Sequence, residues 1–158
     1  MLMCLMASGA FAADNKSQAK LVIGENLTPG MPLKQAIELL GIPDQIAIVR
    51  GTSVDRDSVK ISYAAHGLII RALSNGTQIE GIEIGPTFKG TFQSASGIKL
   101  GVKYEMLIGE YGLPNTVTAQ MMRYPDRNLY FQLNNERLLS AKTYISGSKL
   151  LDANLMNP

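Results

Sequence analysis

Few side chains in this sequence of 158 residues could carry out chemistry, and they do not cluster. His66 is the only histidine and lies in a segment, Ala64 to Gly67, that predicts a loop between strands. Cys4 is the only cysteine. Because zinc sites are built from several His and Cys ligands, the composition excludes a metal site rich in nitrogen or thiolate. We expect His66 to be an exposed residue without a catalytic role.

Carboxylates are the remaining candidates for acid–base chemistry or for calcium. Asp55 and Asp57 flank an arginine, which favours a charged loop tip, and Glu80 or Glu83 would have to supply a partner acid. No serine stands in a G-x-S-x-G elbow, and no glycine pattern matches a phosphate-binding loop. We predict no catalytic residue, no cofactor and no metal. The alternative is a small-molecule-binding protein or a hydrolase that uses these acids in a groove between two halves of the chain.

The charge pattern argues against a nucleic-acid partner. The net charge is only +2, and the lysines and arginines are scattered along the chain. Binding to DNA or RNA rests on a clustered basic surface. We therefore expect a protein or an envelope component as the partner.

The first residues resemble an export signal. Residues 1–13, MLMCLMASGAFAA, carry no charge and end in Ala10-Phe11-Ala12, an apolar segment followed by the small residues of a secretory cleavage site. The basic residues that usually precede such a segment are missing, which indicates a truncated start. The apolar run is too short for a membrane span, which takes about 20 residues. We expect a periplasmic or secreted bacterial protein with no transmembrane span; the alternative for this segment is a buried N-terminal helix.

Two short helices are predicted, and their sequences match each other. The first has apolar residues at the spacing of one helix face, namely Leu33, Ala36, Ile37 and Leu40. The same spacing recurs 71 positions later, at Tyr104, Leu107, Ile108 and Tyr111. The turn residues recur at the same offset, Gly30, Gly41 and Pro43 as Gly101, Gly112 and Pro114. Helices this short need packing against a sheet to be stable.

Strands follow each predicted helix. Residues 46–50, 59–63, 68–73 and 79–84 predict a meander with a hairpin turn at Asn75-Gly76. Residues 117–124, 128–133 and 138–145 predict a second one with a turn at Asn134-Asn135. The two meanders align at an offset of 61, so the first half has a loop about ten residues longer, which we place at residues 51–58.

These patterns predict an α+β fold in which two tandem helix-plus-antiparallel-meander units share one antiparallel sheet, with the helices packed on one face. The expected boundaries are a signal peptide at 1–13, a linker or short pairing strand at 14–26, units at 27–89 and 90–146, and a tail at 147–158. Phe88 and Phe92 are expected to anchor the crossover between the units in the core.

The helix–turn segments carry a family resemblance. Gly30-Met31 with Leu40-Gly41-Ile42-Pro43-Asp44, and Gly101-Val102 with Tyr111-Gly112-Leu113-Pro114-Asn115, resemble the tandem αβ units of the β-lactamase-inhibitor-protein fold. They are also similar to the single unit of the small lipoprotein family of the outer-membrane β-barrel assembly machinery. The resemblance covers most of residues 27–145. It implies an envelope or secreted binding module without chemistry of its own, although a fold alone does not set a function.

The candidate binding surface is the sheet face that points away from the helices. If Phe131 points into the core, the two-residue period of a strand turns Tyr130 and Gln132 outward. By this argument the predicted partner-binding residues are Ile69, Arg71, Met121, Arg123, Tyr130, Gln132, Lys142 and Tyr144. Tyr, Met and Arg are enriched at protein interfaces. We therefore expect an exported, non-enzymatic protein-binding or envelope-assembly module that acts through this face or through the groove between the units.

Two alternatives concern the same face. It could join two copies of the chain in a homodimer, or it could be an ordinary sheet face covered by the tail at residues 147–158.

Overall fold

The computed structural model describes residues 20–151, which form two short helices and ten strands. The helices are α1 (Leu33–Leu40) and α2 (Tyr104–Tyr111). The strands are β1 (Val22–Ile23), β2 (Gln45–Val49), β3 (Ser58–Tyr63), β4 (Leu68–Leu73), β5 (Gly81–Ile84), β6 (Thr91–Phe92), β7 (Thr116–Val117), β8 (Met121–Tyr124), β9 (Leu129–Asn134) and β10 (Arg137–Tyr144). Three 3-10 turns interrupt them, η1 (Val54–Arg56), η2 (Ala64–His66) and η3 (Pro125–Arg127).

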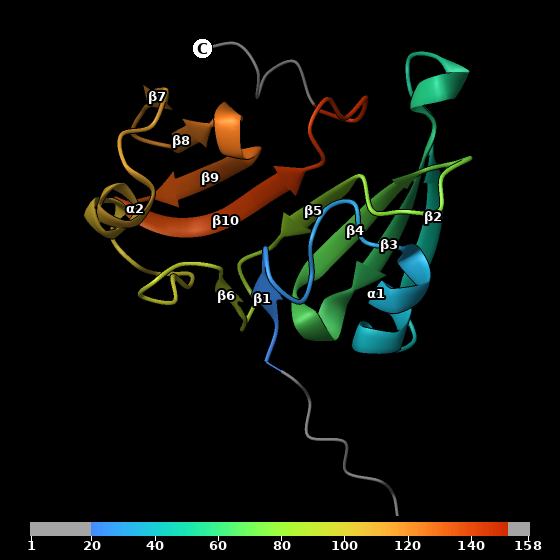
Figure 1. Cartoon of the computed structure of the whole chain (residues 1–158), viewed down its shortest axis with the longest axis horizontal. Coiled ribbons are helices and arrows are strands. Elements are labelled where there is room, and N and C mark those ends of the chain that lie inside the picture. The colour runs from blue at the N-terminus through green and yellow to red at the C-terminus, as the bar shows by residue number, and fades with distance from the viewer. Residues whose placement is uncertain (1–19, 152–158) are drawn as a thin grey trace, which may run out of the picture.

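Eight of the strands form one antiparallel sheet in the order β2-β3-β4-β5-β10-β9-β8-β7 (Figure 1). This confirms the predicted α+β class with a large antiparallel sheet. The centre of the sheet is the pair β5–β10, where Ile84 lies opposite Ala141 and Gly81 opposite Tyr144. We call this pair the seam, because β2–β5 lie on one side of it and β7–β9 on the other. β1 pairs with β6 in parallel, so the expected linker at 14–26 includes a pairing strand.

Both helices contribute to one buried cluster. Ala36 of α1 and Leu107 of α2 are fully buried in the same hydrophobic core as Ile70 and Phe131 of the sheet. The helices lie toward opposite ends of the sheet, with β1 and β6 between them (Figure 1). Phe92 is also buried in this core, as expected for the crossover.

Each helix ends where the following glycine and proline predicted, at Leu40 and at Tyr111. Gly41 and Gly112 follow the last helical turn at φ 84° and 83°, a backbone region that favours glycine. Their amides donate to the carbonyls of Ile37 and Ile108 at 2.8 and 2.9 Å. One detail of the first helix is wrong, since Ile37 is 43% exposed and Leu39 packs against the core instead.

Two loop predictions need correction. Residues 117–124 form two strands, because the Thr118 hydroxyl accepts hydrogen bonds from the amides of Gln120 and Met121 and closes a tight turn between β7 and β8. The extra length of the first half is divided between the loop 50–57 and a longer β2–β3 hairpin. Within that loop Asp57 is buried, at 5% exposure, and is not part of a solvated tip.

Among residues 20–151 no helix is both long enough and apolar enough to cross a membrane. The predicted signal peptide at 1–13 lies outside the described residues.

Candidate binding face

Register brings the predicted residues together on the sheet face that points away from α1 and α2, here called the outer face. Arg123, Tyr130, Lys142, Glu83 and Ile69 are successive cross-strand partners and form one row over β8, β9, β10, β5 and β4. The neighbouring rows contain the other predicted residues, Met121 with Gln132 and Tyr144 with Arg71. The period of the strands thus placed all eight on the same side of the sheet.

The tyrosines of this face are not exposed. Tyr130 and Tyr144 are only 3% and 4% accessible, their rings meeting nearly edge to face with centroids 6.3 Å apart. Leu150 and Leu151, which follow β10, pack against them. Tyr144 also covers Gly81, where an added Cβ would lie 2.7 Å from its ring. The prediction of two exposed tyrosine contacts is therefore wrong, and Leu150 and Leu151 at the start of the tail cover part of the outer face.

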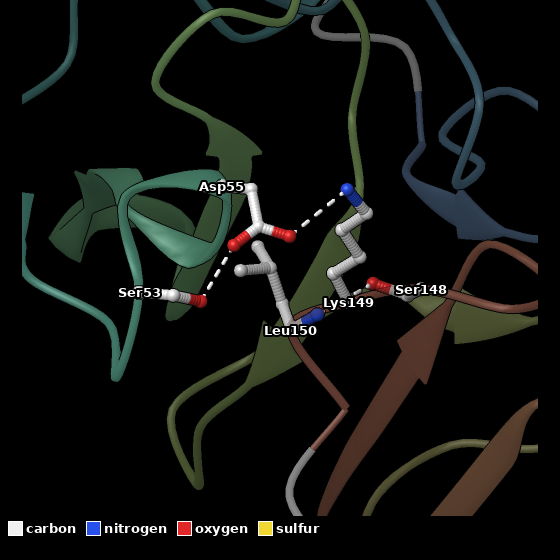
Figure 2. A network of polar contacts seen from close by, with 5 residues as sticks. All are labelled: Ser53, Asp55, Ser148, Lys149 and Leu150. Carbon is white, nitrogen blue, oxygen red and sulfur yellow. Dashed lines mark hydrogen bonds and ion pairs between the residues drawn. The ribbon is translucent and has the colours of Figure 1, made fainter.

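The tail is held across the molecule by polar contacts (Figure 2). The Ser148 hydroxyl donates to Glu80 at 2.7 Å and accepts the Leu150 amide at 3.1 Å. Lys149 reaches Asp55 in η1 at 3.1 Å, and Asp55 in turn accepts from the Ser53 hydroxyl at 2.5 Å. These two partners, Ser53 first and Lys149 second, lower the pKa of the Asp55 carboxyl.

The uncovered part of the outer face is hollowed at the seam. A groove of about 640 Å³ is lined by Ile69, Glu83, Ser140 and Lys142, and by the turn that follows β5 at 85–87. A smaller hollow of about 180 Å³ continues on the other side of Lys142, toward Met121 and Gln132. We call the two together the seam groove. It exists because the chain leaves the sheet after Ile84 while β10 continues to pair with β9.

The charged side chains in and beside the seam groove differ in whether they have an ion-pair partner. The Arg71 Nε atom lies 2.6 Å from Glu83 Oε1, and both side chains are largely buried. Lys142 lies opposite Glu83 in the strand register and is partly buried. Within residues 20–151 no carboxylate lies within ion-pair distance of the Lys142 ammonium. Glu83 is thus already engaged by Arg71, and the Lys142 ammonium stands in the groove without a carboxylate of residues 20–151 at ion-pair distance.

Each residue considered for catalysis is held by structural contacts of its own. Asp57 accepts hydrogen bonds from Gly51 and Arg50, which lower the pKa of its carboxyl, the Gly51 amide most. His66 lies in η2 with Nε2 3.2 Å from the carbonyl of Leu40, a contact that the sequence did not suggest. Each of the acids Asp55, Asp57, Glu80 and Glu83 is held by a cation, a hydroxyl or an amide. In the described part of the chain no three His, Cys, Asp or Glu side chains gather as a metal site requires.

A second, larger hollow of about 880 Å³ lies at the other end of the sheet, beside the β9–β10 turn. Its lining is rich in side-chain amides, including Gln120, Gln132 and Asn134, with Glu136 as its one charged residue. Of the predicted binding residues it contains only Gln132. Size alone therefore does not select the candidate site. The seam groove is preferred because its lining contains five of the eight predicted binding residues, Ile69, Met121, Tyr130, Gln132 and Lys142.

The tail over the tyrosines is the feature that sequence reasoning left open. The signal was present in Leu150-Leu151, an apolar pair that follows the polar stretch at residues 146–149, but nothing local indicates which surface it covers. Comparison with known proteins adds nothing to this geometry: no family model, no curated protein and no solved structure matches the chain.

Proposed function

We propose that this protein is a non-enzymatic binding module that holds an acidic, partly apolar segment of another protein in the seam groove. The observation that carries the proposal is Lys142, a partly buried cation at the centre of the groove with no carboxylate of residues 20–151 at ion-pair distance. A carboxylate from a partner would meet this ammonium in a setting shielded from solvent, where charge pairing is stronger than at an open surface.

The charge of the outer face supports an acidic partner. Within the strands, the register places five cations on it, Lys60, Arg71, Arg123, Arg137 and Lys142, and one acid, Glu83. The whole chain has a net charge of only +2, so positive charge is concentrated on this side of the sheet. Such a surface attracts acidic segments and disfavours basic ones.

The shape of the groove supports a protein segment as the ligand. Ile69 supplies apolar surface on β4, and Ser140 lies on the opposite wall, where its hydroxyl donates to Gln132 at 2.8 Å. An extended segment could place one side chain against Ile69 and a carboxylate on Lys142. The mixture of a few placed polar groups with apolar walls is typical of recognition sites.

The tandem arrangement of two αβ units remains part of this proposal, and backbone hydrogen bonds support it. Gly30 donates to Ile79 at 2.7 Å as Gly101 donates to Leu138 at 2.8 Å. The matching bonds after the helix start are Leu33 to Thr77 and Tyr104 to Glu136, at 2.9 and 3.0 Å. In both halves the turn before the helix thus pairs with the residues that follow the hairpin. The seam would then be the junction of two copies, which is where a groove is expected.

The cellular setting follows from the sequence. The export signal proposed for residues 1–13 and the resemblance to envelope and secreted binding modules would place the protein in the bacterial periplasm or outside the cell. The partner would then be a secreted protein or an envelope component.

Site-specific crosslinking tests the proposal. A photo-crosslinking amino acid replaces Ser140, which lines the groove beside Lys142, in one variant and Lys34, which is 88% exposed on α1, in the other. Exposed to extract from the source periplasm, the position-140 variant should capture a partner whose crosslinked peptide is acidic, and the position-34 variant should not. Equal capture at both positions, or a basic crosslinked peptide, would contradict the proposal.

A further inference from the structure

The free edge of β2 is an unprotected pairing surface. β2 is the first strand in the sheet order, so one side of its backbone has no neighbouring strand among residues 20–151. Its sequence, Gln45 to Val49, contains no charge and no proline. Edge strands usually carry such features, or are very short, because an open edge invites pairing with another chain. The opposite edge strand, β7, has two residues against five in β2.

Apolar side chains accompany this edge. Ile46 and Ile48 on β2 are 62% and 66% exposed, and Ile42, just before the strand, is 93% exposed. Ile37 of α1 adds a further partly exposed side chain. A surface that combines unpaired strand backbone with several isoleucines is typical of an interaction site.

The sequence around β2 is complementary to itself, and from this we infer the partner. We propose that β2 pairs antiparallel with β2 of a second copy of this chain, about a two-fold axis at Ala47. In that register Ile46 faces Ile48 of the other copy, which joins apolar side chains. Asp44 faces Arg50 of the other copy, so opposite charges meet at both ends of the pair. This isologous contact would extend the eight-stranded sheet into the second molecule.

The present contacts of the two charged residues allow this. Asp44 accepts the Ala64 amide at 2.5 Å through one carboxylate oxygen, which leaves acceptor capacity on the other. Arg50 donates to Asp57 through Nη1 at 2.5 Å, yet its side chain is 80% exposed. A guanidinium has five N–H donors, so Arg50 can hold Asp57 and a second carboxylate together.

Two double substitutions on β2 test the dimer and its register. Ile46→Lys with Ile48→Lys places like charges opposite each other and should raise the dimer dissociation constant by about tenfold or more. Ile46→Glu with Ile48→Lys is equally polar but places Glu opposite Lys at both positions, so it should retain the dimer. Val117→Lys on the β7 edge is the control. Sedimentation over a range of concentrations measures association, and circular dichroism checks the fold.

The outcomes separate the alternatives. A wild-type chain that stays monomeric at all concentrations overturns the proposal and leaves the edge to a different partner. A dimer that survives the Ile46→Lys, Ile48→Lys change also overturns the proposal. Loss of the dimer in the Ile46→Glu, Ile48→Lys variant overturns the antiparallel register, because parallel pairing, and not antiparallel pairing, would place like charges opposite each other in that variant.

A thiol crosslink keeps the test decisive if a double variant fails to fold. Ala47→Cys, in a chain that also carries Cys4→Ser, brings two cysteines face to face at the axis and should give a crosslinked dimer with a short bifunctional reagent. Gln45→Cys in the same background should not, because it faces Val49 of the other copy. Equal crosslinking of both, or of neither, contradicts the register.

Discussion

The two sides of the seam build their cores from different residue types. Beside α2, the rings of Phe92, Tyr111, Tyr124 and Phe131 contact one another, with centroids 5.5 to 6.0 Å apart. Beside α1, the residues that the proposed repeat would align with Tyr111, Tyr124 and Phe131 are Leu40, Tyr63 and Ile70, so one aromatic ring stands in place of three. If the two sides are copies of one unit, its backbone pattern accepts an aromatic or an aliphatic filling and depends on burial and turn geometry more than on particular side chains.

The edges of the two sides differ more than their cores. Leu113 and Val117 on the β7 side are exposed, as Ile42 and Ile46 are on the β2 side. However, β7 ends after two residues and β2 continues for five. This difference in length singles out β2 as the edge for the pairing proposed above.

The largest effect is expected from the aromatic core. Phe131→Ala removes the ring that contacts Phe92, Tyr111 and Tyr124, and should lower the free energy of unfolding by about 3–5 kcal/mol. Ile70→Val at the corresponding aliphatic position should cost about 0.5–1.5 kcal/mol. Both variants should unfold in one transition, because the buried cluster is continuous. Denaturant unfolding followed by near- and far-ultraviolet circular dichroism measures this; two separate transitions would show that the halves fold independently.

The residues that precede β4 and β9, Gly67 and Asn128, both have a positive φ, and substituting Gly67 should give the next largest change in stability. Gly67 has φ 66°, and a Cβ there would lie 2.5 Å from the amide nitrogen of Phe88 in the crossover. Gly67→Ala should therefore cost at least about 2 kcal/mol. Asn128 occupies the same place on the other side at φ 52°, and Asn128→Gly should change stability by less than about 0.5 kcal/mol. Thermal unfolding of both variants tests the difference, and a mild effect at Gly67 would mean that the crossover yields easily.

Removing the hydroxyl group of Tyr124 or of Tyr63 should change stability by a smaller amount, and in opposite senses for the two tyrosines. The Tyr124 hydroxyl donates to the carbonyl of Gly112 at 3.0 Å, whereas the Tyr63 hydroxyl is buried without a hydrogen-bond partner among residues 20–151. Tyr124→Phe should cost about 1 kcal/mol, and Tyr63→Phe should be neutral or stabilising. Equilibrium unfolding in urea measures both. If Tyr63→Phe costs as much as Tyr124→Phe, the Tyr63 hydroxyl has a partner in solution.

Acid should affect the loop on the β2 side. Gly51 and then Arg50 lower the pKa of Asp57, so its folded pKa lies below its unfolded value of about 4. Its contribution to stability is then complete above that unfolded value and is lost as the pH falls through the folded pKa. The β7–β8 turn is closed by the hydroxyl of Thr118 and lacks this dependence.

Thermal unfolding between pH 7 and pH 3 tests this. Asp57→Asn should lower the midpoint at pH 7 and flatten its decline in acid, and Asp126→Asn in η3 should leave the profile as in the wild type. A decline that is unchanged in Asp57→Asn would contradict the assignment.

The parts of the fold that depend on neighbouring residues could be predicted from the sequence. Helix spacing with Gly41 and Gly112 gave both helices, and Asn134-Asn135 gave a hairpin, with Asn135 at a positive φ of 48°. The contacts that join distant segments could not be predicted. Leu150 covers Tyr130 and Tyr144, and Lys149 pairs with Asp55, because of how the whole sheet is folded and not because of any local pattern.

The candidate site was predicted in the same uneven way. The two-residue period of strands placed Ile69 and Lys142 on the outer face correctly, because period and register are properties of the strands themselves. Exposure depends on what packs above the sheet, so Tyr130 and Tyr144 were misjudged. A groove between the two halves was expected, but its position and lining were not predicted, since they arise where β5 ends beside a longer β10.

Selection from a displayed random peptide library tests the central proposal most directly. The full chain should enrich peptides that are acidic and contain an apolar residue. Their binding should weaken at least about tenfold in Lys142→Glu, because a like charge then meets the peptide carboxylate, while the equal charge change Lys34→Glu on α1 should leave it nearly unchanged. Enriched peptides without acidic bias, or equal effects of the two substitutions, would contradict a binding role for the seam groove.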